Sequence, residues 1–221
     1  MNMQPSVESA QGDQRQEAVL HALEQLILEK AQGDDVEINV VAIMSRTELP
    51  RTTFYSLFDG QGHAMSELIT TYLGQLGETL MKVLLAEPTI YHHPGDVADA
   101  LIDHYVEFMA RTPAFRHIWV EREMSPLDRR NDEDNDAALL QEFSESMVRA
   151  GFLERSTPES ALELTTYWRF ADRRVNDSLQ GYEGQEVEID TLWGCPVLAG
   201  AKRLIRAGFE SESSAFRTQR C

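Results

Sequence analysis

The chain has 221 residues, 42% of them hydrophobic and 26% charged, which is the composition of an ordinary globular protein of one or two domains. Its net charge of −17 excludes a general polyanion binder, and its two cysteines exclude a disulfide framework or a zinc cluster. No apolar run reaches the roughly 18 residues that suggest a membrane span. The polar segment 1–14 lacks the order of a signal peptide, so we expect a disordered tail on a cytoplasmic protein.

Apolar residues recur at intervals of three and four along most of the chain, as Val19, Leu23 and Leu26 do. The sequence therefore predicts an all-α fold with essentially no sheet. Glycine, proline and N-cap signals mark the helix ends. The expected helices are one that ends at Gly33, then 40–46, 50–57, 63–87, 94–111, 114–123, 137–150, 158–179 and 190–208. The segment 211–221 is expected to be frayed.

Three short helices followed by a long one, as in residues 15–62 and the helix after them, are typical of a helix-turn-helix DNA-binding domain. The third helix would lie in the major groove, where Arg51 can pair with a guanine edge and Thr52 can meet a thymine methyl group. Other polar side chains of the second and third helices complete the predicted DNA-binding set: Asn39, Arg46, Thr47, Thr53, Tyr55 and Ser56. Asn39 is also the expected N-cap of the second helix, and a solvated helix end is the alternative for Arg46.

The stretch Thr53-Phe54-Tyr55-Ser56-Leu57-Phe58 resembles the Thr-x-Tyr-x-x-Phe motif of the TetR/AcrR family of transcriptional regulators. Residues 43–50 resemble the Ile-Ala-x-x-Ala-Gly-Val-Ser stretch that precedes it, with Glu48 at the turn glycine, Pro50 at the serine cap and Gln61 in place of a later lysine. Residues 111–115, 150–153 and 157–161 resemble junctions of the family's ligand-binding body. The resemblance extends over about residues 14–208, and only residues 53–58 match a motif of the family closely.

This resemblance implies a homodimer whose head binds operator DNA and whose body, residues 63–210, binds a small effector and dimerises through helices 158–179 and 190–208. Effector binding would change the spacing of the two heads, as in a repressor. The large side chains expected to line the effector pocket, for each of which a plain core role is the alternative, are Tyr105, Phe108, Met109, Phe115, Trp119, Met124, Phe143 and Trp168. The polar anchors considered are His104, Arg116, His117 and Arg122, or Glu121 and Glu123 for a cationic effector.

The expected head is acidic, with nine acidic and three basic side chains between Gln16 and Tyr72. Because phosphate contacts depend on lysine and arginine, two hypotheses follow. Either the head binds one operator through few ionic contacts, which we favour, or it has kept the fold and contacts a protein instead. No GxSxG, P-loop or GxGxxG motif occurs, so we predict neither an enzyme nor a cofactor. The neighbours His92 and His93 would point apart on a helix, which does not favour a metal pair.

Overall fold

The computed structural model describes residues 7–85, 91–120, 157–182 and 184–217, and, of the segment 141–151, residues 141–142, 144–145, 147–149 and 151. All regular elements of these ranges are helices, so the all-α prediction is confirmed for them. The helices are α1 (Val7–Ala31), α2 (Val40–Ser45), α3 (Arg51–Leu57), α4 (Gln61–Leu84), α5 (Pro94–Arg111), α6 (Pro113–Val120), α8 (Pro158–Leu179), α9 (Ile189–Trp193) and α10 (Pro196–Arg217). None of the described helices is both long and apolar enough to cross a membrane.

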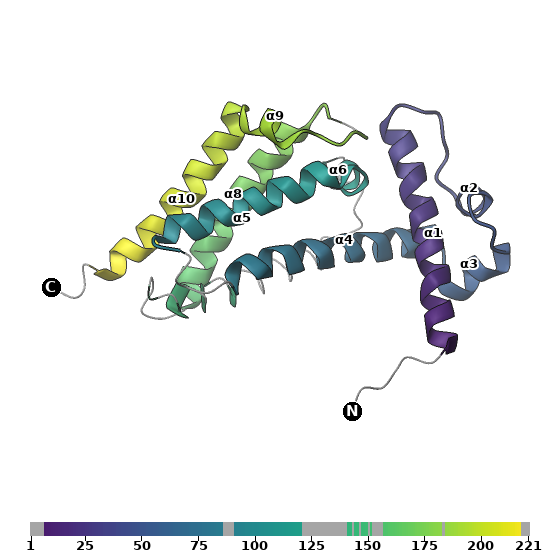
Figure 1. Ribbon diagram of the computed structural model, residues 1–221, viewed down its shortest axis with the longest axis horizontal. Coiled ribbons are helices and arrows are strands. Elements are labelled where there is room, and N and C mark those ends of the chain that lie inside the picture. The colour runs from purple at the N-terminus through teal and green to yellow at the C-terminus, as the bar shows by residue number, and fades with distance from the viewer. Residues whose placement is uncertain are drawn as a thin grey trace.

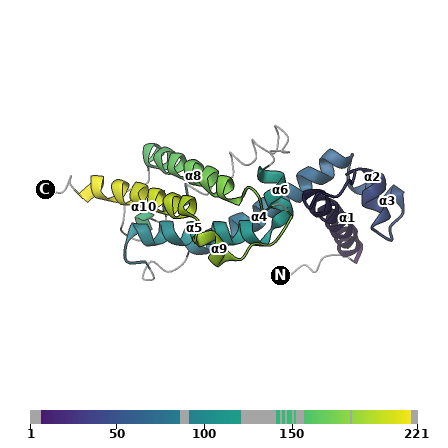
Figure 2. The same cartoon turned by 90° about the horizontal axis from the view of Figure 1, so that it is seen from above.

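The molecule is elongated, with α1, α2 and α3 at one end and α8 and α10 toward the other (Figure 1). The view from above shows the same order along the long axis (Figure 2). Helix α1 packs against α2, α3, α4 and α6, while α10 packs against both α8 and α5. One continuous cluster of buried apolar side chains extends from α1 to α10, so the helices at the two ends share a core.

The end formed by α1, α2 and α3, which we call the head, is organised around apolar side chains at helical spacing. Leu23 and Leu26 of α1 are buried together with Ile43 of α2. Phe54 of α3 and Phe58, which follows the last residue of α3, are buried in the same cluster. The Asn39 side chain caps α2 by accepting a hydrogen bond of 2.9 Å from the backbone N–H of Ala42, as predicted. Two short helices with little intrinsic stability are therefore held by packing on α1.

Several predicted helix ends differ from the structure. Helix α1 already begins at Val7, so the expected tail 1–14 is wrong from that residue onward. The single helix expected over 190–208 is two helices, α9 and α10, because Pro196 has no N–H with which to continue α9. The N–H of Cys195 instead bonds back to the carbonyl of Leu192 at 2.9 Å. Helix α10 then runs to Arg217, through most of the segment that we expected to be frayed.

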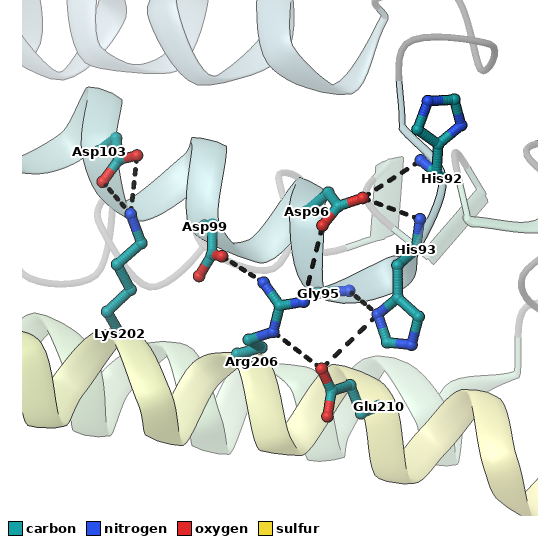
Figure 3. Close-up of polar contacts among 9 residues, drawn as sticks. All are labelled: His92, His93, Gly95, Asp96, Asp99, Asp103, Lys202, Arg206 and Glu210. Carbon is teal, nitrogen blue, oxygen red and sulfur yellow. Dashed lines mark hydrogen bonds and ion pairs between the residues drawn. The ribbon is translucent and has the colours of Figure 1, made fainter.

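Helices α5 and α10 face each other through charged side chains, which we call the polar seam (Figure 3). Lys202 Nζ donates to both carboxylate oxygens of Asp103 at 2.7 and 2.8 Å. Arg206 binds Asp99 and lies 3.6 Å from Asp96, and its Nε donates to Glu210 at 2.9 Å. Ion pairs as exposed as these contribute at most about 1 kcal/mol each, so the seam fixes the register of α10 on α5 more than it stabilises the fold.

The start of α5 is attached to the same seam. His93 Nδ1 accepts the N–H of Gly95 at 3.1 Å, and the Asp96 carboxylate accepts the backbone N–H of His93 at 3.0 Å. The His93 ring also lies 3.6 Å from Glu210 of α10 (Figure 3). His93 therefore caps a helix, and among the described residues no group of three potential metal ligands comes together.

Helices α8 and α10 approach closely at Gly208. A Cβ atom at this position would lie 2.6 Å from Cδ2 of the Tyr167 ring on α8, well inside van der Waals contact. The absence of a side chain at position 208 is therefore what lets the tyrosine ring lie flat against the backbone of α10.

Candidate functional site

The outer face of α3 carries the central residues of the predicted DNA-binding set. Arg51, Thr52, Tyr55 and Ser56 are exposed, while Phe54 on the opposite face is completely buried. The Tyr55 side chain is 57% exposed, and its ring touches only the edge of Phe54 in the ring contacts of the described residues. The helix thus presents a cation, three hydroxyl groups and an aromatic ring on one surface.

Other members of the predicted set take part in contacts within the head. Arg46 forms an ion pair with Glu29 of α1 and donates to the carbonyl of Ala42 at 3.3 Å. The Thr47 hydroxyl donates to the carbonyl of Met44 at 3.1 Å, and Asn39 is the cap of α2. These three side chains hold the turn and the helix start that position α3.

Thr53 is only partly exposed at the side of α3, and the Ser56 hydroxyl donates to its carbonyl oxygen at 2.7 Å. Among the described residues, Arg51 forms no ion pair, whereas Arg46 is neutralised by Glu29. Arg51 is therefore the cation of this surface that is available to a phosphate or a base edge.

The predicted effector-pocket residues pack into two groups of aromatic rings in the body. Phe115 of α6 is in ring contact with Tyr72 of α4, Phe108 of α5 and Trp119, with centroid separations of 5.2, 5.8 and 5.1 Å. Tyr105 of α5 contacts Trp168 of α8 at 5.3 Å. Six of the eight predicted residues are described: Tyr105, Met109, Phe115 and Trp168 are buried, and Phe108 and Trp119 are partly exposed. Met124 and Phe143 lie outside the described residues.

Asp172 of α8 joins these two groups. Its carboxylate accepts hydrogen bonds from the Tyr105 hydroxyl, from Asn176 Nδ2 at 3.0 Å and from the Trp119 side chain. Burial raises the pKa of Asp172 above that of an ordinary aspartate, although the hydrogen bonds oppose the shift. Sequence reasoning missed this residue, although it stands on the apolar stripe of α8 that contains Trp168 and Val175, where a charged side chain is unexpected.

Arg116, considered as an anchor for an acidic effector, has a structural role instead. The side chain is 2% exposed, and its guanidinium donates to the carbonyls of Met109 at 2.8 Å, Ala110 at 3.3 Å and Tyr182 at 2.6 Å, and also to that of Gln185. Burial lowers its pKa. Arg116 therefore joins the end of α5 to the loop after α8, and both terminal nitrogens of its guanidinium are used in these contacts.

The other proposed anchors lie in different surroundings. The His104 ring is hydrogen-bonded to the carbonyl of Ala100 at 2.8 Å on an exposed part of α5. Both ring nitrogens of His117 are buried without a hydrogen-bond partner. Glu121, Arg122 and Glu123 lie outside the described residues.

A hollow of about 950 Å³ lies between the first half of α1, the middle of α4 and the start of α6. Its described lining includes the polar side chains of Glu17, His21, Glu24, Tyr72 and Thr112. The predicted pocket residues are not part of that lining. Tyr72 borders the hollow and donates a hydrogen bond to Glu24. The pKa of the Tyr72 hydroxyl is raised, mainly because the group is buried and in addition because of this hydrogen bond.

Besides the packing of α1 on α4 and α6, two side-chain hydrogen bonds join the body to the head. One is the Tyr72–Glu24 hydrogen bond between α4 and α1. The other is at the end of α1, where Gln32 Nε2 donates to the carbonyl of Gly184 at 3.0 Å. Gly184 has a φ of +65°, and a Cβ there would lie 2.8 Å from Gln32 Cγ, so a residue with a side chain would disturb this contact.

The outer surface of α8 and α10 carries large apolar side chains. Leu162 is 67% exposed and Phe170 is 47% exposed on α8, and Val197 is 38% exposed on α10. By contrast, Leu198, Ala201 and Ile205, which lie in the second helix expected to form the dimer interface, are buried within the chain.

No family model and no curated protein sequence matches this chain.

Proposed function

We propose that the chain is a DNA-binding transcriptional regulator of the TetR type, in which α2 and α3 form a helix-turn-helix and α3 enters the major groove. The observation that carries the proposal is the outer face of α3, where Arg51 has no ion-pair partner among the described residues and Tyr55 is largely exposed. In this proposal Arg51 and Thr52 contact base edges, and Tyr55 and Ser56 contact phosphates. Asn39, Arg46 and Thr47 act indirectly, because they hold α2 and the turn in place.

The proposed active form is a homodimer in which α8 and α10 of two copies form a four-helix interface. Leu162, Phe170 and Val197 support this arrangement, since a second copy would remove their apolar surface from water. Two heads related by a two-fold axis would then bind two half-sites. Light scattering tests this step: Phe170→Glu should give a monomer at concentrations at which the unchanged protein and an Asp177→Asn control are dimers.

A small effector bound in the body would act on the head through the two contacts at α1. The Tyr72–Glu24 and Gln32–Gly184 hydrogen bonds connect the body to the C-terminal half of this helix and to the residue that follows its end. A change in the body that shifts α4 or the loop at Gly184 would rotate α1, and with it α3. DNA affinity would fall because the distance between the two heads would no longer match the half-sites.

The DNA hypothesis is tested by selection of bound sequences from a random DNA library at low salt, followed by fluorescence anisotropy with the enriched sequence. We expect an enriched two-fold sequence that Arg51→Ala and Tyr55→Ala bind more weakly. Arg111→Ala is the matched control, because Arg111 is an exposed arginine of the body that pairs with Glu107 at 2.6 Å. A folded dimer that enriches no sequence would refute DNA binding.

A second candidate function is a head that contacts another protein. The acidic character of this region favours it, since residues 16–72 contain nine acidic and only three basic side chains, and one of the basic ones, Arg46, is paired with Glu29. In this case the library selection yields no sequence, while Arg51→Ala and Tyr55→Ala leave the cellular phenotype unchanged.

A further inference from the structure

The body holds a buried carboxyl group, that of Asp172, which has no positively charged partner in the described part of the chain. Asp172 accepts three hydrogen bonds, from Tyr105, Trp119 and Asn176, but all three donors are neutral groups. Of the nearby arginines on α8, Arg173 is exposed and Arg174 lies over the Phe170 ring at 5.1 Å. A carboxylate withdrawn from water without a cation destabilises a fold, so its presence requires a reason.

A second acceptor beside this carboxylate is unused. Asn176 donates its amide N–H to Asp172, and its own Oδ1 is buried without a hydrogen-bond partner. Buried acceptors are almost always paired in folded proteins. An unused carbonyl next to an uncompensated carboxylate indicates that a donor with a positive charge belongs between them.

Aromatic rings surround the same place on three helices. Tyr105 comes from α5, Trp119 from α6 and Trp168 from α8, and the last is in ring contact with Tyr105. Trp119, Asp172 and Asn176 are partly exposed, so the cluster has a side that solvent reaches. Aromatic faces attract cations, most strongly where water is excluded.

We propose that Asp172, Asn176, Tyr105, Trp119 and Trp168 form a binding site for a protonated organic amine that carries an apolar group. The ammonium N–H groups would donate to the Asp172 carboxylate and to Asn176 Oδ1, and the apolar group would pack on the tryptophan and tyrosine rings. A neutral ligand would leave the charge uncompensated, and an anion would be repelled. This inference rests on the proposed function only in identifying the amine as the effector.

The position of the site explains how binding of such an amine would affect the head. Trp119 is in ring contact with Phe115, and Phe115 with Tyr72, which donates its hydroxyl hydrogen to Glu24 of α1. An amine that draws Asp172 away from Trp119 would move the first ring of this series. The contact that holds α1 lies at its other end.

Binding can be measured without DNA, through the tryptophan fluorescence of the full chain. Trp193→Phe is the starting protein, because Trp193 lies under Lys202 of the polar seam and would add an unrelated signal. The probes are benzylammonium, its neutral analogue benzyl alcohol, the anion benzoate and the quaternary benzyltrimethylammonium ion. Asp172→Asn tests the charge, since it keeps the shape of the side chain, and Asp177→Asn is the control on an exposed position of the same helix.

We expect a saturable fluorescence change with benzylammonium, at least about tenfold weaker binding of benzyl alcohol and none of benzoate. Benzyltrimethylammonium should bind more weakly than benzylammonium, because it has no N–H for Asn176. Asp172→Asn should lower the affinity by about thirtyfold or more, and Asp177→Asn should leave it unchanged.

Equal affinity for the amine and the alcohol, tighter binding of benzoate, or no saturable change with benzylammonium would overturn the proposal. The comparison of ligands uses the unsubstituted site, so it decides even if Asp172→Asn fails to fold. If the amine binds but the library selection finds no DNA, the site stands and the regulatory function fails. The reverse result leaves DNA binding intact and removes the amine site.

Discussion

The close approach of α8 and α10 at Gly208 allows a sharp test of how the body is packed. An alanine Cβ at position 208 would lie 2.6 Å from Cδ2 and 2.7 Å from Cγ of Tyr167, about 1 Å inside van der Waals contact. Overpacking of this kind costs about 1–3 kcal/mol. Alanine is a better helix former than glycine by about 1 kcal/mol, which offsets part of that cost. Gly208→Ala should therefore lower the free energy of unfolding by about 0–2 kcal/mol.

Gly200 provides the matched control on the same helix. A Cβ at position 200 would meet only Arg203 Nη2 at 3.9 Å, which is ordinary contact. Gly200→Ala should therefore gain the full helix propensity, about 1 kcal/mol, and the two variants should differ by about 1–3 kcal/mol. Urea unfolding followed by far-ultraviolet circular dichroism measures this difference. For a chain of this size the melting temperatures should differ by about 2–4 °C for each kcal/mol.

A third variant identifies the cause. If the Tyr167 ring is what the new methyl group meets, Gly208→Ala should cost less in a Tyr167→Ala background than in the unchanged protein. Equal effects of Gly208→Ala and Gly200→Ala, or the same cost with and without the ring, would show that the close approach does not limit the packing of α8 on α10.

Three further outcomes follow from single residues. Because folding raises the pKa of Asp172, the ionised carboxylate destabilises the folded protein above that pKa, and this destabilisation disappears as the pH falls toward the pKa of the unfolded chain. Asp172→Asn should therefore raise the melting temperature at pH 8 and raise it less in acid. The control Asp177→Asn should leave the melting temperature unchanged at both pH values. Arg116→Met should lower the urea-derived free energy of unfolding by about 3 kcal/mol or more, because it leaves buried carbonyls unpaired; a loss below about 1 kcal/mol would contradict the role of the guanidinium. Because Arg51, the unpaired cation of each α3, is assigned to a base edge and hydroxyl groups contact the phosphates, the DNA affinity of the dimer should show a shallow salt dependence, with a log–log slope no steeper than about −2. A much steeper slope would mean that other cations bind phosphate.

The head was predictable because its signals are local. The Asn39 cap, the turn before Arg51 and the burial of Phe54 and Phe58 follow from residues a few positions apart. The break between α9 and α10 was also visible as Pro196, but the apolar spacing across it suggested one helix. Leu198, Ala201 and Ile205 of α10 are buried within the chain, whereas Val197 of the same helix remains exposed.

The functional details of the body were less predictable because they depend on residues far apart in the sequence. The Tyr105 hydroxyl and Asp172 are 67 positions apart, and Arg116 reaches carbonyls 66 and 69 positions away. Periodicity indicates that a residue lies on a buried face, but it does not identify the partner that satisfies a buried charge. Arg116 could therefore be mistaken for a ligand anchor, and Asp172 passed unnoticed in an acidic chain.

The Arg116 junction also affects the order in which the protein can be completed during synthesis. Arg116 donates to the carbonyls of Tyr182 and Gln185, and the loop between them accepts the Gln32 contact at the end of α1. On the ribosome, α1, α2 and α3 emerge long before that loop. The head can therefore fold early and pack on α4 and α6, yet the contact of Gln32 with the loop at Gly184 forms only after residue 185 has been released, and during that interval this end of α1 is free to pair with the wrong surface.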